Sequence, residues 1–300
     1  TAYEISTRDW SSDVCSSDLA TGVWVDSLRD GRAPLVQPSQ GTHIVVDAEF
    51  SPGEQAILIP DTSDGRITFI IPWMGKRIIG TTDVAVGSSD SRALPEPLPS
   101  SGEIDLLLTE AARVLRKAPV RSDIRSAWSG LRPLVRPSRA ADNHDTASLS
   151  REHWTGIDQP GLISITGGKW TTCLAMARGA MAAATKAGFL SGPGRTRVPN
   201  SGPAPVHRGP ATAPIGGTIP SAEQVRWLAR HAWVRRVEDL LGRRSRLMYL
   251  DLRAAIAAAP LLADVLSEET GVDPGLEAFQ DIAHAWLVAI ERRSVTEASS

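Results

Sequence analysis

The sequence predicts an α+β protein in which an antiparallel sheet and a strand–turn–helix unit precede an all-α part. Three observations lead to this prediction. From residues 42 to 82, apolar and polar residues alternate with the period of half-buried strands. Residues 161–172 read as a short apolar strand, a double-glycine turn and the start of a helix. Helical stripes follow a segment, 188–220, that holds 7 glycines and 7 prolines in 33 residues.

Composition narrows the classes of function. A chain of 300 residues with 42% hydrophobic content suggests about two domains with a real core. The net charge of −2 argues against a nucleic-acid partner. The 2 cysteines give no disulfide framework, and the 6 histidines stand at no metal-ligand spacing, so we expect a reducing compartment and no metal site. No apolar run reaches about 18 residues, which predicts no membrane-spanning helix.

Residues 1–19 follow neither a helical nor a strand period, and they resemble translated sequencing adapter. We therefore expect them to be non-native or disordered and leave them out of the fold prediction. The same observation predicts that the chain is truncated at its N-terminus.

The next segments are assigned in chain order. A short helix is expected from residue 23 to 28, followed by a polar link over 34–40. The meander comprises strands 43–47, 56–60, 67–72 and 77–80. Ser100 and Glu103 form a capping box for a helix that runs to about Lys117. A strand over 124–130 and a strand start at 150–154 come before the motif at 161–172.

The C-terminal part is predicted to be helical throughout. Ser221 and Gln224 make a second capping box, and an apolar stripe follows it. Further helices are expected over 247–258, 261–269 and 276–292, separated by Pro260 and by the glycines of 271–275.

The double-glycine turn is the first candidate site. Gly167 and Gly168 would let a ligand approach the backbone, and Lys169, Thr171 and Thr172 add donors where the helix begins. Helix N-termini favour anions because their first N–H groups lack partners and the macrodipole is positive there. The alternative is an ordinary strand-to-helix connection in which the glycines serve only the turn.

Other candidates stand at strand-to-loop junctions. Arg132 and Arg151, like Lys169, are suited to binding a phosphate or a carboxylate, and His43 is suited to proton transfer. The alternative for each arginine and for the lysine is a solvated surface cation, and for His43 it is a structural histidine. Only their convergence on one pocket would favour the functional interpretation. The sequence contains no Gly-x-Ser-x-Gly, no Gly-x-Gly-x-x-Gly and no phosphate-binding P-loop.

Several motifs in order resemble the FAD-dependent, quinone-linked sn-glycerol-3-phosphate dehydrogenases of the D-amino-acid-oxidase-like flavoprotein group. They are Ala20-Thr-Gly-Val-Trp24, Gly41-Thr-His-Ile-Val45, Ile71-Pro-Trp73, Ile79-Gly-Thr-Thr-Asp83, Trp128-Ser-Gly-Leu-Arg-Pro-Leu134, Ser150-Arg-Glu152, Thr166-Gly-Gly-Lys-Trp-Thr-Thr172 and, in the helical part, residues 231–244.

The resemblance implies a fold and its domains. It implies an antiparallel-sheet substrate domain, the C-terminal part of an FAD-binding domain and an all-α C-terminal domain. The corresponding boundaries are 20–40 for a returning FAD-domain segment, 41–160 for the substrate domain, 161–187 for an FAD-domain strand and helix, 188–220 for a linker and 221–300 for the helical domain.

The resemblance also implies roles for individual residues. Ala20, Thr21, Gly22, Gly167, Gly168 and Lys169 would contact FAD. Arg132, Arg151, Lys169 and Thr171 would bind the substrate. His43 would be the base for the C2 hydroxyl, with Lys169 as its competitor, and Arg132 would hold the substrate near its hydroxyl or its phosphate. Because the dinucleotide-binding half is missing, we expect this fragment to be inactive.

The implied reaction is oxidation of sn-glycerol-3-phosphate to dihydroxyacetone phosphate, with electrons passed to quinone. The implied partners are a phosphorylated polyol, quinone, a peripheral membrane contact and a homodimer, without nucleic acid. The expected location is the cytoplasm, on the inner face of the cytoplasmic membrane. Two alternatives stay open: a flavoprotein of the same group that acts on an amine or another hydroxy acid, and a non-catalytic α+β binding module.

Overall fold

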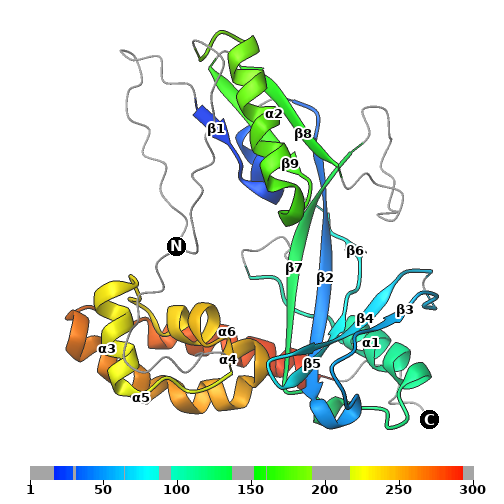
Figure 1. Ribbon diagram of the computed structural model, residues 1–300, viewed down its shortest axis with the longest axis vertical. Helices are drawn as coiled ribbons and strands as arrows, with labels where there is room; N and C mark the ends of the chain where they lie inside the picture. The colour runs from blue at the N-terminus through cyan, green and yellow to red at the C-terminus, as the bar shows by residue number, and fades with distance from the viewer. Residues whose placement is uncertain are drawn as a thin grey trace. The chain divides into compact units, whose positions relative to one another are not determined.

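The computed structural model describes residues 17–29, 32–63, 65–87, 96–136, 152–159, 161–190 and 217–292. The chain divides into two compact units (Figure 1). The first unit comprises residues 1–39, 85–88 and 132–201, and the second comprises 40–84, 89–131 and 202–300. Strands β2 (Val36–Asp47) and β7 (Ser126–Val135) contribute residues to both.

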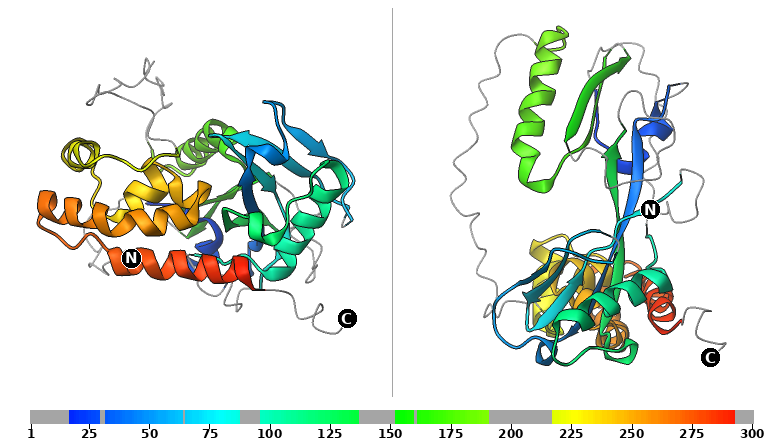
Figure 2. Two further views of the ribbon diagram at one scale, coloured as in Figure 1. Left: turned by 90° about the horizontal axis from the view of Figure 1, so that it is seen from below. Right: turned by 90° about the vertical axis from the view of Figure 1, so that its right-hand side faces the viewer.

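The first unit contains a three-stranded sheet in the order β1-β9-β8. β1 (Ser17–Leu19) runs parallel to β9 (Leu162–Gly167), and β8 (His153–Gln159) runs antiparallel to β9 on its other side. Helix α2 (Cys173–Lys186) lies along β8 and β9 (Figure 2). β9 confirms the predicted strand before the double glycine.

β1 corrects an expectation, because its three residues fall in the segment that the sequence pattern left without regular structure. Its ladder joins Ser17 to Leu162 and Leu19 to Ser164 through the backbone. Backbone pairing of so short a strand needs no side-chain period, so residues 17–19 carry no pattern that would reveal it.

The second unit is built on the predicted antiparallel meander. Its sheet has the order β3-β4-β5-β2-β6, and β7 also pairs with β2. The bounds are Ile57–Ile59 for β3, Thr68–Trp73 for β4, Lys76–Gly80 for β5 and Val84–Ala85 for β6. Ile79 pairs with Ile44 on one side and with Ile70 on the other. All three are buried, so this register places them in the hydrophobic core.

β2 begins earlier than predicted, because residues 36–40 form strand and not a polar link. Val36, Ser39 and Gln40 are buried. Pro38 has no N–H to donate, but its carbonyl accepts a hydrogen bond of 2.9 Å from the Val86 N–H. A proline is tolerated in a strand where only its carbonyl is required.

Helix α1 (Ser101–Val114) has the predicted capping box. The Ser100 hydroxyl accepts from the Glu103 N–H, while the Glu103 carboxylate accepts from the Ser100 N–H. Its buried face, which includes Ile104, Leu107 and Ala111, joins the core of the sheet. The helix ends at Val114, three residues before the predicted position of 117.

The C-terminal helices are α3 (Ala222–His231), a π-helical turn over Asp239–Arg244, α4 (Leu247–Leu250), α5 (Leu252–Thr270) and α6 (Leu276–Glu291). The predicted capping box at Ser221 is present. These helices share one hydrophobic core with the sheet. No helix in the described ranges is long and apolar enough to cross a bilayer.

Pro260 does not separate two helices as predicted, because α5 continues through it. Proline removes one intrahelical hydrogen bond. On either side of Pro260, Ala259, Leu262 and Leu266 are buried in the core. Burial on both sides therefore holds the helix together where the local sequence favours a break.

Candidate functional site

The turn after β9 is shaped by its two glycines. Gly167 and Gly168 have φ angles of 76° and 71°, in the region that favours glycine. A Cβ on Gly167 would lie 2.6 Å from the Glu152 carbonyl oxygen, and the Gly168 N–H donates to that oxygen at 3.2 Å. The glycines are therefore required by packing against the chain just before β8, in addition to any approach by a ligand.

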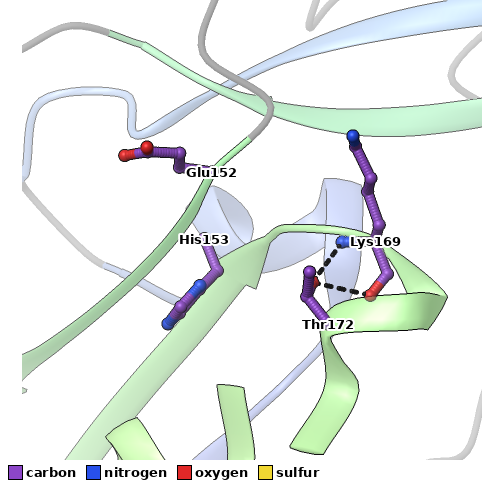
Figure 3. Close-up of a pocket in the computed structure, with 4 residues that line it drawn as sticks. All are labelled: Glu152, His153, Lys169 and Thr172. Atoms are coloured by element: carbon purple, nitrogen blue, oxygen red, sulfur yellow. Dashed lines mark hydrogen bonds between the residues drawn. The ribbon is translucent and has the colours of Figure 1, made fainter. Parts of the chain in front are cut away.

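The helix begins in two stages. Trp170–Thr172 form a 3₁₀ turn, and α2 starts at Cys173. The Lys169 N–H donates to the Thr172 hydroxyl at 3.0 Å, and that hydroxyl donates to the Lys169 carbonyl at 2.9 Å (Figure 3). The Lys169 N–H, one of the backbone donors predicted to be available to a ligand, is therefore already bonded within the turn. The Thr172 hydroxyl is its acceptor.

The ammonium of Lys169 is directed away from this hydroxyl. Figure 3 draws the lysine side chain pointing away from Thr172, and the residue is exposed. Within the described ranges no carboxylate pairs with it, and the first turns of the two helical segments contain no acidic residue. Thr171, beside it, is also exposed. The helix start therefore presents a positive charge that no ion pair neutralises in the described part of the chain.

A cavity of about 530 Å³ lies next to this lysine. Glu152, His153, Lys169 and Thr172 line it (Figure 3). Its volume falls in the range of about 300–1,000 Å³ that is typical of ligand sites. It combines a cation, an imidazole, a carboxylate and a hydroxyl, so it can bind a polar ligand with acceptor groups.

His153 was not singled out from the sequence. A Cβ on Gly168 would lie 3.1 Å from the His153 Cβ, and one on Gly179 would lie 3.5 Å from its Nε2, an ordinary van der Waals distance. No local feature of the sequence marks His153, because its place at the cavity depends on the pairing of β8 with β9.

The segment at 20–22 lies beside the β9 turn. β1, which precedes it, pairs with β9, and the Thr166 hydroxyl donates to the Gly22 carbonyl at 3.3 Å. Gly22 has a φ of 60°. The Thr21 hydroxyl oxygen is buried and has no hydrogen-bond partner in the described part of the chain. The first unit thus brings together the candidates Ala20, Thr21, Gly22, Gly167, Gly168, Lys169 and Thr171.

His43 belongs to the second unit. Its ring stacks on Trp128 with centroids 5.6 Å apart and planes 14° apart. His43 pairs across the ladder with Gly80, where a Cβ would lie 2.3 Å from the His43 Cδ2. Only glycine leaves room for the imidazole at this register.

The residues beside His43 are held by a buried carboxylate. Glu103 accepts hydrogen bonds from the Gln40 amide at 2.7 Å and from the hydroxyls of Thr42 and Thr82 at 2.8 Å and 2.6 Å. The Ser100 hydroxyl donates to it at 2.8 Å. With 5% exposure, Glu103 is buried but well supplied with donors. It therefore fixes the middle of β2, where His43 lies.

The two arginine candidates are Arg132 and Arg151. Arg132 lies on β7, partly buried, in the residues of the first unit. Arg151 lies outside the described residues. Within the described ranges there is no group of three His, Cys, Asp or Glu side chains that could hold a metal ion.

The chain matches a known protein family. The model of the family described as FAD dependent oxidoreductase matches residues 19–174. This range contains the segment at 20–22, His43, Arg132 and the turn at 167–172.

Similar proteins carry one name. A mitochondrial glycerol-3-phosphate dehydrogenase of Arabidopsis thaliana is 40% identical over 175 residues, covering 57% of this chain and 27% of the relative. The mitochondrial glycerol-3-phosphate dehydrogenase of Homo sapiens is 41% identical over 184 residues, covering 59% of this chain and 24% of the relative. The chain spans about a quarter of the length of these curated relatives.

One solved structure shares the fold. It is a glycerol-3-phosphate dehydrogenase from Bacillus halodurans complexed with FAD, with a TM-score of 0.62 and 22% identity. The match covers 91% of this chain and 62% of that one. The predicted fold class, a mixture of helices and antiparallel sheet that ends in a helical region, is confirmed.

Proposed function

The chain belongs to the family of FAD dependent oxidoreductases, and from this premise we propose that it is part of a glycerol-3-phosphate dehydrogenase. The reaction is oxidation of sn-glycerol-3-phosphate to dihydroxyacetone phosphate. The observation that carries the proposal is the identity of 40% and 41% to relatives of that name. The exposed ammonium of Lys169 beside a ligand-sized cavity supports it, because such a site suits a polar cofactor or substrate.

The residues of the first unit fit an FAD cofactor. The buried Thr21 hydroxyl lacks a partner among the described residues, and no ion pair joins the Lys169 ammonium to a carboxylate there. Both are donors, and flavin rings present carbonyl and nitrogen acceptors. FAD, when bound, supplies the hydride acceptor of the reaction. Ala20, Thr21, Gly22, Gly167, Gly168 and Lys169 are the residues that would hold it.

Lys169 has an electrostatic role in this proposal. Its positive charge, at the start of a helical segment without acidic residues, stabilises negative charge that develops next to it. Thr171 adds a hydroxyl at the same exposed position.

The remaining roles concern the substrate. Arg132 and Arg151 bind the phosphate, because a guanidinium can donate two parallel hydrogen bonds to its oxygens. His43 takes the proton of the C2 hydroxyl. Its stacking on Trp128 fixes the ring plane, which a base needs in order to meet a proton at a defined angle.

The test compares two lysines of the same helical segment in the protein expressed from its complete reading frame. Lys169→Ala is expected to lower kcat/KM for sn-glycerol-3-phosphate by about 10-fold or more, since a hydrogen bond to a charged group contributes roughly 1.5–3 kcal/mol. Lys186→Ala, at the far end of α2, removes the same charge from another exposed residue. It is expected to stay within about twofold of the parent. Equal losses in the two variants would argue against the site.

The proposal has three further parts: quinone as the electron acceptor, a homodimer, and a position on the inner face of the cytoplasmic membrane. Reduction of a soluble quinone analogue that depends on sn-glycerol-3-phosphate tests the first of these. Sedimentation equilibrium and fractionation of cells into cytosol and membranes test the other two.

A further inference from the structure

Two neighbouring strands of the second unit carry a pair of rings and, next to it, a pair of hydroxyls. β7 lies beside β2 (Figure 1). The His43 ring of β2 stacks on the Trp128 ring of β7. Thr42 and Ser129, which adjoin these rings in the two strands, have their hydroxyl oxygens 2.6 Å apart. Because successive side chains of a strand point to opposite faces, the hydroxyl pair lies on the face behind the stacked rings.

The direction of the hydrogen bond between the two hydroxyls follows from the Glu103 carboxylate. Thr42 donates its single hydroxyl proton to Glu103 at 2.8 Å. A hydroxyl that has used its proton can only accept from a second hydroxyl, so Ser129 is the donor to Thr42. The hydrogen bonds therefore run in one direction, from Ser129 through Thr42 to Glu103.

A third segment around His43 is bonded to the same carboxylate. Thr82 follows Gly80, against which the His43 ring packs, by two residues. The Thr82 hydroxyl donates to Glu103 at 2.6 Å and accepts from the Thr42 N–H at 2.8 Å. Thr42, Thr82 and Glu103 are all buried, and in the low-dielectric interior such bonds are electrostatically stronger than in water. The segments that carry His43, Gly80 and Trp128 are thus held together by these hydroxyls and one carboxylate, here called the Glu103 network.

We propose that Thr42 and Ser129 are positioning residues for His43, which they hold in place by fixing β2 against β7. The inference rests on the proposed function, in which His43 takes the proton of the C2 hydroxyl. A base must lie within hydrogen-bond reach of the proton that it removes. A displacement of about 1 Å at a reacting group can lower a rate by about 100-fold. The two hydroxyls therefore affect the rate through the place of the imidazole.

Chemical modification of His43 tests the positioning without a cofactor. Diethyl pyrocarbonate is applied to the chain itself, and mass spectrometry of its peptides gives the rate at which each histidine is modified. Ser129→Ala removes the first donor of the Glu103 network, so we expect His43 to be modified severalfold faster than in the parent. His284, exposed on α6, is the internal reference and is expected to react at the parent rate.

Flavin reduction tests the consequence for the reaction in the protein expressed from its complete reading frame. With saturating sn-glycerol-3-phosphate under anaerobic conditions, the first-order rate constant of bleaching reports only on molecules that hold flavin, so a loss of folded protein leaves it unchanged. Ser129→Ala is expected to lower this rate constant about fivefold or more. The deficit is expected to shrink as the pH is raised from about 7 to about 9, because hydroxide can replace a misplaced base.

Three variants separate positioning from the general effect of losing a hydroxyl. Ser126→Ala removes a buried hydroxyl of the same strand, which donates to the Met248 carbonyl at 2.7 Å, and is expected to behave like the parent in both assays. Thr42→Val keeps the shape of the side chain without its hydroxyl and is expected to reproduce the losses of Ser129→Ala. Thr42→Ser keeps the hydroxyl and is expected to retain most of the parent rate.

Equal modification rates of His43 in Ser129→Ala and Ser126→Ala would overturn the positioning role. Equal bleaching rate constants in these two variants, or a Ser129→Ala deficit that stays the same at every pH, would also overturn it. Each of these results leaves the proposed function intact if the flavin of the parent is bleached. If sn-glycerol-3-phosphate does not bleach the parent, the proposed function fails and this inference fails with it.

Discussion

At the scale of single residues, glycines control where the candidate side chains can lie. Gly80 leaves room for the His43 ring, and Gly168 leaves room for the Met176 sulfur and the His153 Cβ. These two glycines therefore serve packing, and Gly168, like Gly167, combines it with a positive φ.

Gly80→Ala tests this for His43. Its Cβ would lie 2.3 Å from the His43 Cδ2 and 2.9 Å from Cγ, so the ring must move. We expect a loss of unfolding free energy of about 1–3 kcal/mol, as for overpacked cores, measured by urea denaturation.

Gly102→Ala is the matched control. Gly102 lies in the first turn of α1, and a Cβ there would meet no atom within 4 Å. Alanine is expected to raise stability by about 0.5–1 kcal/mol because it restricts the unfolded chain. If Gly80→Ala were as stable as this control, the close fit of His43 would be disproved.

Sequence reasoning reached some of the site residues and missed others for a physical reason. Lys169 and His43 were found because their chemistry and their position next to glycines or strand ends are local properties. Glu152 and His153 line the cavity only because β8 pairs with β9. A pairing between separate strands leaves no local mark on the residues that it brings together.

At the scale of elements, Glu103 ties α1 to the strands. Glu103→Ala would leave the buried Gln40 and Thr42 donors without their acceptor. We expect a loss of roughly 3 kcal/mol or more of unfolding free energy, and a smaller loss for Glu103→Gln, which keeps the shape. Glu223→Ala removes an exposed acid from the first turn of α3 and should change stability by less than about 1 kcal/mol. Equal losses for Glu103→Ala and Glu223→Ala would contradict this role.

Asp47, at the end of β2, predicts a pH dependence. Burial acts to raise its pKa, but hydrogen bonds and charges of Arg125 and Lys76 outweigh burial and hold the pKa below its ordinary value. Lys76 lies 2.6 Å away. Because the folded-state pKa is lowered, the stabilisation is present above the pKa of the unfolded state, about 4, and is lost as pH falls through the folded value.

We therefore expect the parent to lose more stability than Asp47→Asn when the pH is lowered from about 5 to about 2.5. Denaturant titrations over this range measure the difference. Asp264→Asn, which removes an exposed carboxylate of α5 with no ion pair among the described residues, controls for general acid effects. Parallel pH profiles for the parent and Asp47→Asn would refute the prediction.

The elements that the sequence predicted well are those with local causes. Both capping boxes occur where serine precedes Glu103 or Gln224 by three residues, and the meander strands follow the period of two. The start of β2 and the continuity of α5 through Pro260 were missed. In both, tertiary burial and pairing override a proline that locally predicts a break.

At the scale of the whole molecule, each unit serves a separate part of the proposal. The first unit collects the residues proposed for the cofactor, and the second contains the meander with His43. The exposure of a single tryptophan such as Trp233, and the pairing of basic residues with acids, cannot be read from local sequence pattern.

The most direct test of the central claim uses the protein expressed from its complete reading frame. Under anaerobic conditions, sn-glycerol-3-phosphate is expected to bleach the absorbance of its bound flavin, while glycerol, an amine and a 2-hydroxy acid leave it unchanged. Absence of bound flavin, or bleaching by the amine or the hydroxy acid and not by sn-glycerol-3-phosphate, would contradict the proposed function.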